Sequence, residues 1–350
     1  MRPAIDSQTV TFRVPDSARN LASVNLLQEV SRPRDGPPFI REQGTWTLCF
    51  PRPDADRLEY KLKLVRRSGD IQMICDPGNP LRAPGPFGDK SVVEWPEYRP
   101  PAWLDDSADG GITKEILVTS RTLEVEFEVR IWTPAGRESS EPLPLLVVHD
   151  GFEYADHCRL LGFLGACVRD RRLPPHRAAL LAPVDRDLTY SASASYSHAL
   201  VHEILPALRH EAPSPRGRRM RLGMGASLGA LAMLHAHRKN PAGFGGLFLQ
   251  SGSYFRPSFD PQESSFVKFV RISQFMAEVL TQADWAHVIP VAMTCGKAEE
   301  NLVNNRATRD ALLRQGYEVR LHETRDAHNW VSWRDAFDPH LIDLLNRLWG

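Results

Sequence analysis

The chain has 350 residues, of which 42% are hydrophobic and 25% are charged, so it is long enough for two domains of a globular protein. Lysine plus arginine and aspartate plus glutamate both total 43, and this balance leaves no charge excess that would favour nucleic acid or an anionic membrane as a partner. No apolar stretch reaches the roughly 18 residues of a membrane span, and the start of the chain lacks a signal-peptide core, so we expect a cytoplasmic protein.

Five cysteines are spread along the chain, and no two of them form a CxxC pair. Their odd number argues against a disulfide framework, and their spacing argues against a metal cluster. We therefore expect buried, reduced thiols at these positions: Cys49, Cys75, Cys158, Cys167 and Cys295.

The first part of the chain has the pattern of β-strands. "TVTFRV", "TWTLCFP" and "RLEYKLKLV" alternate apolar with polar residues or are rich in β-branched and aromatic types, and Leu21–Val30 is a helical alternative. We predict a β-sandwich of immunoglobulin-like, early-set type over residues 1–107. Within it "DPGNP" (76–80) predicts a rigid turn, and the stretch 94–111, rich in proline, acidic residues and glycine, predicts a linker.

Residues 108–350 show a different pattern, in which short apolar runs alternate with helix-like stretches. Such alternation is typical of an α/β fold with a mostly parallel sheet covered by helices on both faces. We predict eight strands, the first two as an antiparallel hairpin with Arg121-Thr122 near its turn. The strands are expected at 114–120, 125–132, 144–150, 178–184, 221–224, 246–251, 289–295 and 317–323, and helices at 196–210, 228–239 and 305–316.

The segment "RLGMGASLGALAM" (221–233) places Ser227 between a predicted strand and a predicted helix. A Gly-x-Ser-x-Gly motif in that setting predicts a nucleophile elbow, a sharp strand-to-helix turn that presents the serine hydroxyl. Gly225 and Gly229 fit this interpretation because a Cβ at either flank would crowd the turn. The alternative is a glycine-rich junction without chemistry.

A serine nucleophile needs a base and an acid, and in this arrangement both follow it in the chain. His328 in "RDAHNW" lies in a short loop between the last strand and a closing helix, where the base is expected. The acid is expected after the strand that ends at Cys295, where "CGKAEEN" offers Glu299, our preference, and Glu300. Asp326 is a third candidate whose position suits holding the loop.

Acyl transfer places negative charge on the carbonyl oxygen, so two aimed N–H donors are expected. We predict the backbone N–H of Leu228 as one donor and the backbone of Gly151–Phe152 as the other. His149 precedes these residues and is expected to form a wall of the pocket. Arg186 is a candidate for binding an acidic or catecholate oxygen, with an ion pair to Asp185 or Asp187 as the alternative.

Six ordered segments resemble the enterochelin-esterase and esterase D-type branch of the α/β-hydrolases, which includes feruloyl and S-formylglutathione esterases and, more distantly, mycolyltransferases. The segments are "PLLVVHDGFEY", "DRDLTYSAS", "LGMGASLGALAML", "LQSGS", "TCGKAEEN" and "AHNWVSWRDAF". The resemblance covers about residues 110–350 and implies an α/β-hydrolase fold with Ser227 as nucleophile, His328 as base and Glu299 as acid. Relatives often carry Gly-Gly-His-Asp-Trp where this chain has "DAHNW", which keeps His328 and Trp330, and Trp330 joins Arg186 as a candidate substrate-binding residue.

The N-terminal region resembles the β-sandwich that precedes the catalytic domain of enterochelin esterases, with "RLEYKLKLV" and "DPGNP" as the similar part. Between the sixth and seventh strands, residues 259–280 carry a broad apolar helical stripe. This stripe suits either a wall of the acyl pocket or packing against the core.

The sequence thus predicts a serine carboxylesterase that works through an acyl-enzyme on a small-molecule ester and needs no metal or cofactor. Siderophore lactones, aryl esters and sugar esters remain open as substrates, and a homo-oligomer is one option for its assembly. One alternative is acyl transfer to an alcohol at the same site. Another is a carbohydrate-binding or scaffold protein with a silent hydrolase domain.

Overall fold

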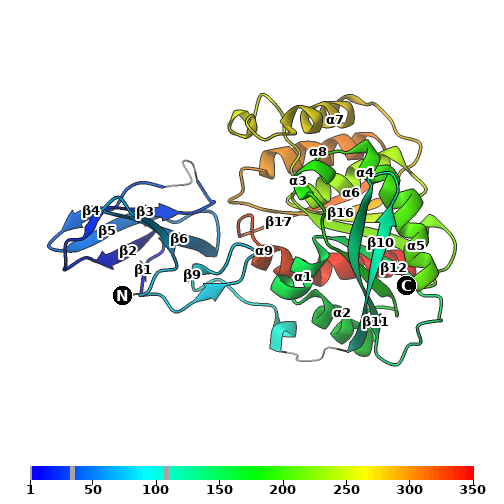
Figure 1. Cartoon of the computed structure of the whole chain (residues 1–350), viewed down its shortest axis with the longest axis horizontal. Helices are drawn as coiled ribbons and strands as arrows, with labels where there is room; N and C mark the ends of the chain where they lie inside the picture. Colours follow the sequence, from blue (N-terminus) through cyan, green and yellow to red (C-terminus); the bar gives the residue numbers. More distant parts are fainter. Residues whose placement is uncertain (1, 32–35, 106–109) are drawn as a thin grey trace. The chain divides into compact units, whose positions relative to one another are not determined.

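The computed structural model describes residues 2–31, 36–105 and 110–350, and the chain divides into two compact units (Figure 1). The smaller unit comprises Met1–Arg99, Gly296–Glu300 and Glu323–Ser332, and the larger unit comprises Pro100–Cys295, Asn301–His322 and Trp333–Gly350. The predicted domain boundary between residues 107 and 108 lies outside the described residues.

The N-terminal part of the smaller unit consists of two small sheets. One sheet has the strand order β1-β2-β5-β4, and the other has the order β3-β6-β9-β8 with β7 paired to β6. The strands are β1 (Ala4–Ile5), β2 (Thr9–Pro15), β3 (Leu21–Leu27), β4 (Ile40–Glu42), β5 (Thr45–Pro51), β6 (Arg57–Arg66), β7 (Ile71–Ile74), β8 (Arg82–Ala83) and β9 (Lys90–Glu94).

Both sheets contribute side chains to one apolar core. In β2 every second residue is buried, with Phe12 at its centre, and β6 repeats the pattern with Tyr60, whose ring lies 4.8 Å from that of Phe12. A sequence that alternates apolar and polar residues gives a strand one buried face. The alternation therefore predicted these strands correctly. The helical alternative for Leu21–Val30 is wrong: Leu21–Leu27 form β3, in which Val24 and Leu26 point into the core.

The predicted linker 94–111 begins too early. Glu94 ends β9, and the side chain of Trp95 is only 2% exposed within the core of the two sheets. Its backbone N–H donates to the carbonyl of Asp56 over 2.9 Å. The prolines and acidic residues around Trp95 suggested a linker from residue 94 onward, but the side chain of Trp95 belongs to the core of the two sheets.

The larger unit contains a sheet of eight strands within the described residues, in the order β10-β11-β13-β12-β14-β15-β16-β17. The strands are β10 (Gly111–Ser120), β11 (Val125–Pro134), β12 (Leu145–His149), β13 (Arg177–Leu181), β14 (Arg221–Ala226), β15 (Gly246–Gln250), β16 (Pro290–Gly296) and β17 (Glu318–Thr324). Each overlaps a predicted range. The predicted hairpin is confirmed, because β10 and β11 pair antiparallel from Ser120 opposite Val125 onward.

Helices cover both faces of this sheet, with α1, α2 and α10 on one side and α6, α7 and α8 on the other (Figure 1). The helices are α1 (Gly151–Cys158), α2 (Leu160–Arg169), α3 (Arg186–Thr189), α4 (Ala194–Ala199), α5 (Leu205–Glu211), α6 (Leu228–Lys239), α7 (Phe269–Thr281), α8 (Leu302–Arg314), α9 (Trp330–Asp335) and α10 (Ile342–Trp349). The predicted helix 196–210 is α4 and α5 joined by a wider turn at Leu200–Ile204. Residues 228–239 form α6 as predicted.

The apolar stripe of α7 belongs to the core of the larger unit. Phe269, Ile272, Phe275 and Met276 are buried in the same cluster as side chains of the sheet. Core packing therefore accounts for these residues, and of the two interpretations of the stripe the structure favours this one.

The cysteines are all free, but only three fit the expectation of burial. Cys158, Cys167 and Cys295 are buried, whereas Cys75 is half-buried and Cys49 is exposed on β5, where alternation turns every second side chain toward solvent. None of the helices in residues 2–31, 36–105 and 110–350 has both the length and the apolar character that crossing a membrane requires.

The buried Trp95 provides a test of the smaller unit. Trp95→Ala removes a large side chain from a closed core and is expected to lower the free energy of unfolding by about 3–5 kcal/mol. Phe87→Ala is the matched control, because Phe87 is 92% exposed and its removal should change stability by less than about 0.5 kcal/mol. Denaturant unfolding followed by circular dichroism measures both, and equal effects would contradict the burial of Trp95.

Candidate active site

Ser227 is the single residue between a strand and a helix, and its backbone is strained. Strand β14 ends at Ala226 and α6 begins at Leu228. Between them the backbone of Ser227 has φ 55° and ψ −122°, a conformation that residues with a side chain rarely adopt. Its backbone N–H donates to the carbonyl of Gln250 over 2.9 Å, and its carbonyl accepts from the N–H of Ser253 over 3.2 Å. These bonds to the end of β15 hold the strained conformation in place.

The two glycines of the motif have separate steric reasons. A Cβ on Gly225 would lie 2.6 Å from the backbone of Gly229, so the close approach of strand and helix requires glycine there. A Cβ on Gly229 would lie 3.1 Å from the Asp150 carboxylate and 3.2 Å from the side chain of His149. The prediction that a side chain would crowd the turn is thus confirmed, most strongly for Gly225.

The loop after β15 supports the Ser227 hydroxyl, and the sequence analysis did not identify it as part of the site. The Oγ atoms of Ser253 and Ser227 lie 3.0 Å apart. Ser251 has a left-handed φ of 49°, its Oγ accepts from Trp333 Nε1 over 2.9 Å, and Asn305 exchanges two hydrogen bonds with the backbone of Gly252. The segment "LQSGS" contains this loop, but the residues that its side chains and backbone contact lie far away in the sequence.

Two helix starts lie at the carboxyl edge of neighbouring parallel strands. Strands β12 and β14 pair parallel, so the first turns of α1 and α6, with Gly151–Phe152 and Leu228, begin at the same edge of the sheet. The first turn of a helix has N–H groups without an intrahelical acceptor, which suits both predicted oxyanion donors. Gly151 is required by packing, since a Cβ would lie 2.4 Å from Leu180 Cα, and the Phe152 ring lies under the guanidinium of Arg130.

An ion pair with a buried carboxylate lies beside these helix starts. Asp150, the residue before α1, has a left-handed φ of 48°, and its carboxylate binds Arg186 through two bonds of 2.7 and 2.8 Å. The predicted alternative of an Arg186 ion pair with Asp185 or Asp187 is therefore wrong about the partner. Asp185 instead caps α3 by accepting from the N–H of Leu188, a role that the turn sequence permits.

His149 is a structural residue. Its Nδ1 donates to the carbonyl of Gly229 over 3.0 Å, and its Nε2 accepts from the Tyr196 hydroxyl over 2.7 Å. Burial lowers the pKa of His149 to about 4, so the ring is neutral and both nitrogens are occupied. That His149 forms a wall of the substrate pocket stays a prediction.

In the smaller unit, His328 and Glu299 form a direct pair. The distance from His328 Nδ1 to Glu299 Oε2 is 2.9 Å, and the Glu299 side chain is buried whereas Glu300 is exposed. Glu299 Oε1 also accepts from the N–H of Gly296 over 2.7 Å. Burial opposes protonation of His328, but the charge of Glu299 and its hydrogen bond prevail and raise the pKa of the imidazole.

Asp326 holds the loop around His328, as its position suggested. Its carboxylate accepts from the N–H of Ala327 over 2.8 Å and from Asn329 Nδ2 over 2.9 Å, and it pairs with Arg57. Burial raises the pKa of Asp326 to about 6, which Arg57 partly offsets. Trp330 begins α9 and is half-buried. The structure thus joins His328 to Glu299 within the smaller unit, while Ser227 belongs to the larger unit.

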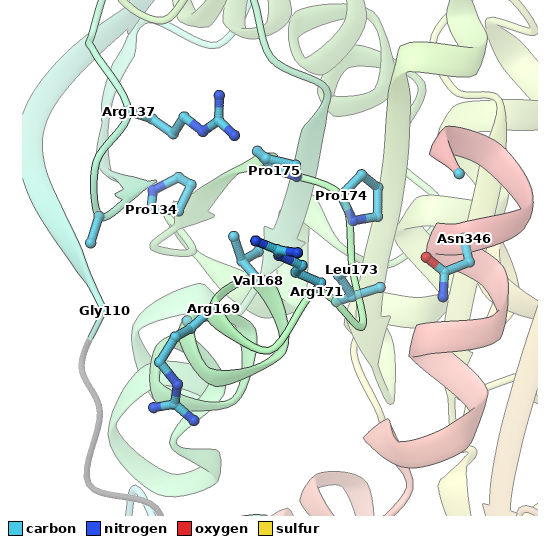
Figure 2. Close-up of a pocket in the computed structure, with 13 residues that line it drawn as sticks. Gly110, Pro134, Arg137, Val168, Arg169, Arg171, Leu173, Pro174, Pro175 and Asn346 are labelled. Atoms are coloured by element: carbon cyan, nitrogen blue, oxygen red, sulfur yellow. The ribbon is translucent and has the colours of Figure 1, made fainter.

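A separate cavity of 630 Å³ lies in the larger unit (Figure 2). Figure 2 shows Pro134 from the end of β11, Pro174 and Pro175 before β13, and Arg137 and Arg171 around it. This is the amino-terminal end of β13, which runs parallel to β12 and β14, so the cavity lies at the edge of the sheet opposite to Ser227. None of the predicted site residues lines this cavity. In the described part of the chain, no cluster of His, Cys, Asp or Glu suits a metal ion.

The chain is similar to known esterases. The profile of the putative esterase family matches residues 120–344. The chain is 28% identical over 302 residues to the iron(III) enterobactin esterase of Escherichia coli O6:H1, covering 84% of this chain and 72% of that protein. It is 27% identical over 341 residues to the iron(III) enterobactin esterase of Escherichia coli K12, covering 94% and 82%.

Solved structures show the same fold. The crystal structure of an enterobactin esterase from Shigella flexneri in the presence of enterobactin has a TM-score of 0.77 and 22% identity, and the match covers 99% of this chain and 95% of that one. The ferric enterobactin esterase of Salmonella typhimurium has a TM-score of 0.79 and 20% identity, with 97% and 94% covered. The fold of the chain is therefore of the α/β-hydrolase type.

The strand–helix contact at Gly225 yields a stability prediction. Gly225→Ala places a methyl group against the Gly229 backbone and is expected to lower the free energy of unfolding by about 1–3 kcal/mol. Gly110→Ala is the control in the same unit, because its Cβ would lie at an ordinary distance of 3.6 Å from Gly165. Thermal unfolding of both variants measures the difference, and a Gly225→Ala variant as stable as Gly110→Ala would contradict the steric account.

Proposed function

We propose, from the premise that this chain belongs to the putative esterase family, that it is a serine carboxylesterase in which Ser227 is the nucleophile, His328 the base and Glu299 the acid. The family match and the enterobactin esterase relatives show a hydrolase that acts on ester bonds. The observation that carries the mechanism is the strained backbone of Ser227, because proteins maintain such strain where it presents a reactive group.

The hydrogen bonding of His328 supports its role. Glu299 accepts from Nδ1–H, so the neutral ring carries its lone pair on Nε2. In the proposed reaction Nε2 takes the proton of Ser227 Oγ as the oxygen bonds to the ester carbonyl carbon. The proton then passes to the leaving alcohol as the ester C–O bond breaks. Water attacks the acyl-enzyme with His328 again as base, which releases the acid and restores the Ser227 hydroxyl.

Charge on the carbonyl oxygen requires donors that are already in place. We assign the Leu228 N–H and the Gly151–Phe152 backbone to this task, because both belong to first helical turns at one edge of the sheet. The left-handed Asp150, fixed by Arg186, sets the direction in which α1 begins. The His149 bond to the Gly229 carbonyl fixes the first turn of α6 in the same way.

A siderophore ester is the substrate class that we place first, because the curated relatives are iron(III) enterobactin esterases. Arg186 suits such an anionic ligand: its Nε and Nη2 bind Asp150, its side chain is 35% exposed, and Nη1 is the donor that a substrate oxygen would meet. Trp330, which is half-buried and lies two residues after His328, is the proposed aromatic contact.

Removing the nucleophile tests the mechanism. Ser227→Ala is expected to lower kcat for p-nitrophenyl acetate and for a catecholate siderophore lactone on the order of 10⁴-fold or more, and to abolish labelling by a fluorophosphonate. Ser197→Ala is the control, because it removes another buried hydroxyl of the same unit, one that bonds to His235. Full turnover by Ser227→Ala would overturn the proposal, and product analysis with added alcohol separates hydrolysis from acyl transfer.

The raised pKa of His328 gives a pH prediction. The base must be neutral, so activity is lost as the pH falls through the pKa of His328, and the acid limb of kcat/KM is expected above the ordinary histidine value of 6.5. Glu299→Gln removes the charge that raises this pKa while burial still lowers it. The midpoint of the limb should therefore move to lower pH, and kcat at the plateau should fall by about 10²- to 10⁴-fold.

The neighbouring acid provides the matched control for this pH profile. Glu300 is exposed, and Glu300→Gln is expected to leave both the midpoint and the plateau of kcat/KM unchanged. If Glu300→Gln moved the acid limb and Glu299→Gln did not, the assignment of the acid would be wrong.

A further inference from the structure

We infer that the N-terminal sheets hold the loop that carries His328, and that Arg57 is a positioning residue that acts on this histidine through Asp326. The inference rests on the proposed function, because only a catalytic His328 makes its position matter for turnover. It deepens that function by giving residues 1–99 a part in catalysis that does not depend on binding any ligand.

The first connection joins the start of β6 to the loop after β17. The backbone N–H of Asp56 donates to the carbonyl of Arg325 over 2.7 Å. The Arg325 guanidinium returns to the same segment and pairs with Asp56 over 3.0 Å and with Asp54 over 2.6 Å. The Arg325 side chain is half exposed, so these ion pairs contribute little by themselves, but the backbone bond fixes the register of the loop.

The second connection is a buried ion pair. Arg57 Nη1 lies 3.2 Å from Asp326 Oδ2, and their side chains are only 3% and 8% exposed. An ion pair so shielded from water is strongly sensitive to loss of one partner, because the other ion is then buried without compensation. Glu59 lies 3.5 Å and Glu94 lies 3.6 Å from Arg57, so the guanidinium faces three carboxylates, of which Asp326 is the nearest.

Asp326 carries this constraint into the loop around His328. While Oδ2 faces Arg57, Oδ1 accepts from the N–H of Ala327 and from Asn329 Nδ2. Asn329 Oδ1 in turn accepts from the N–H of Ser332 over 2.8 Å. Ala327 and Asn329 are the two chain neighbours of His328, so the orientation of the Asp326 carboxylate sets the backbone on both sides of the imidazole.

Apolar packing and charge complete the support. Val331 is buried against Ala83 and Val92 of the N-terminal strands β8 and β9. The charges that act on His328 are Glu299, followed more weakly by Glu29 and by Lys90, which itself pairs with Glu29 and Glu59. The loop is therefore held by a backbone bond, a buried ion pair and an apolar contact, all from residues 54–92.

Arg57→Met tests this inference, with Arg57→Lys as the conservative variant. The methionine leaves the Asp326 carboxylate buried without its cation, and we expect kcat for p-nitrophenyl acetate to fall on the order of 10- to 100-fold with KM changed less than about threefold. The acid limb should move to higher pH, because loss of the cation makes protonation of Asp326 easier, and the protonated carboxyl no longer holds the loop as the carboxylate does. Arg57→Lys should restore part of kcat.

Arg41→Met is the matched control. Arg41 pairs with the buried Asp16 over 3.7 Å in the same unit and contacts nothing in residues 323–332 among the contacts described. Hydrogen exchange of the full-length variants supplies a readout that does not depend on ester chemistry. Arg57→Met should speed amide exchange in residues 323–332, whereas Arg41→Met should leave exchange there, kcat and the acid limb as in the wild type.

The outcomes separate the two proposals. Wild-type exchange in residues 323–332 of Arg57→Met, or faster exchange with unchanged kcat and pH profile, overturns the positioning role. Equal effects of Arg41→Met and Arg57→Met on kcat also overturn it, because they indicate a general loss of stability. Activity retained in Ser227→Ala instead overturns the proposed function, and the exchange experiment still decides whether Arg57 holds the loop.

Discussion

The strained backbone of Ser227 is the constraint on which the larger unit depends. A φ of 55° at a residue with a side chain is unfavourable, and the turn persists because β14 and β15 are fixed in a parallel pair whose last bonds include the Ser227 N–H to Gln250. The same turn brings α6 against the strand so closely that only glycine fits at 225. The pairing of β14 with β15 therefore holds Ser227 in its strained conformation, and that conformation determines where α6 begins.

Glu299, the proposed acid of the triad, is held in place by hydrogen bonds and not by backbone strain. Here two loops bond to each other: the N–H of Lys297 donates to the Thr324 carbonyl, and a Cβ on Gly296 would lie 2.4 Å from the Asp326 carbonyl. Glu299 is consequently fixed from both ends, with one oxygen on the Gly296 N–H and the other on His328. Such a carboxylate needs no side-chain freedom to orient the imidazole, which lowers the entropic cost of keeping the pair aligned.

Sequence reasoning succeeded where the information is local. The strand–motif–helix order around Ser227 predicted the turn, and the position of Glu299 after a strand predicted the partner of His328 before any contact was known. It failed for the Arg186 partner, for Ser253 and for Arg57, because no motif marks these pairs, whose members lie 26 to 269 positions apart. Periodicity and motifs do not encode such pairings. The helical alternative at Leu21–Val30 failed for a related reason: a short apolar run has no period strong enough to outweigh the sheet that receives it.

The histidines illustrate how one residue type acquires two roles. His149 and His235 are buried among uncharged hydroxyl and backbone partners, and burial lowers their pKa values to about 4 and about 3, so they remain neutral scaffold at any physiological pH. His328 is half-buried, yet the Glu299 carboxylate at 2.9 Å outweighs desolvation and raises the pKa of the imidazole. A base of this kind needs a carboxylate that is held in place beside it. The structure meets that need with a backbone N–H on Glu299, and it balances the neighbouring Asp326 with the Arg57 cation, so that the charges around His328 are set by contacts from distant parts of the chain.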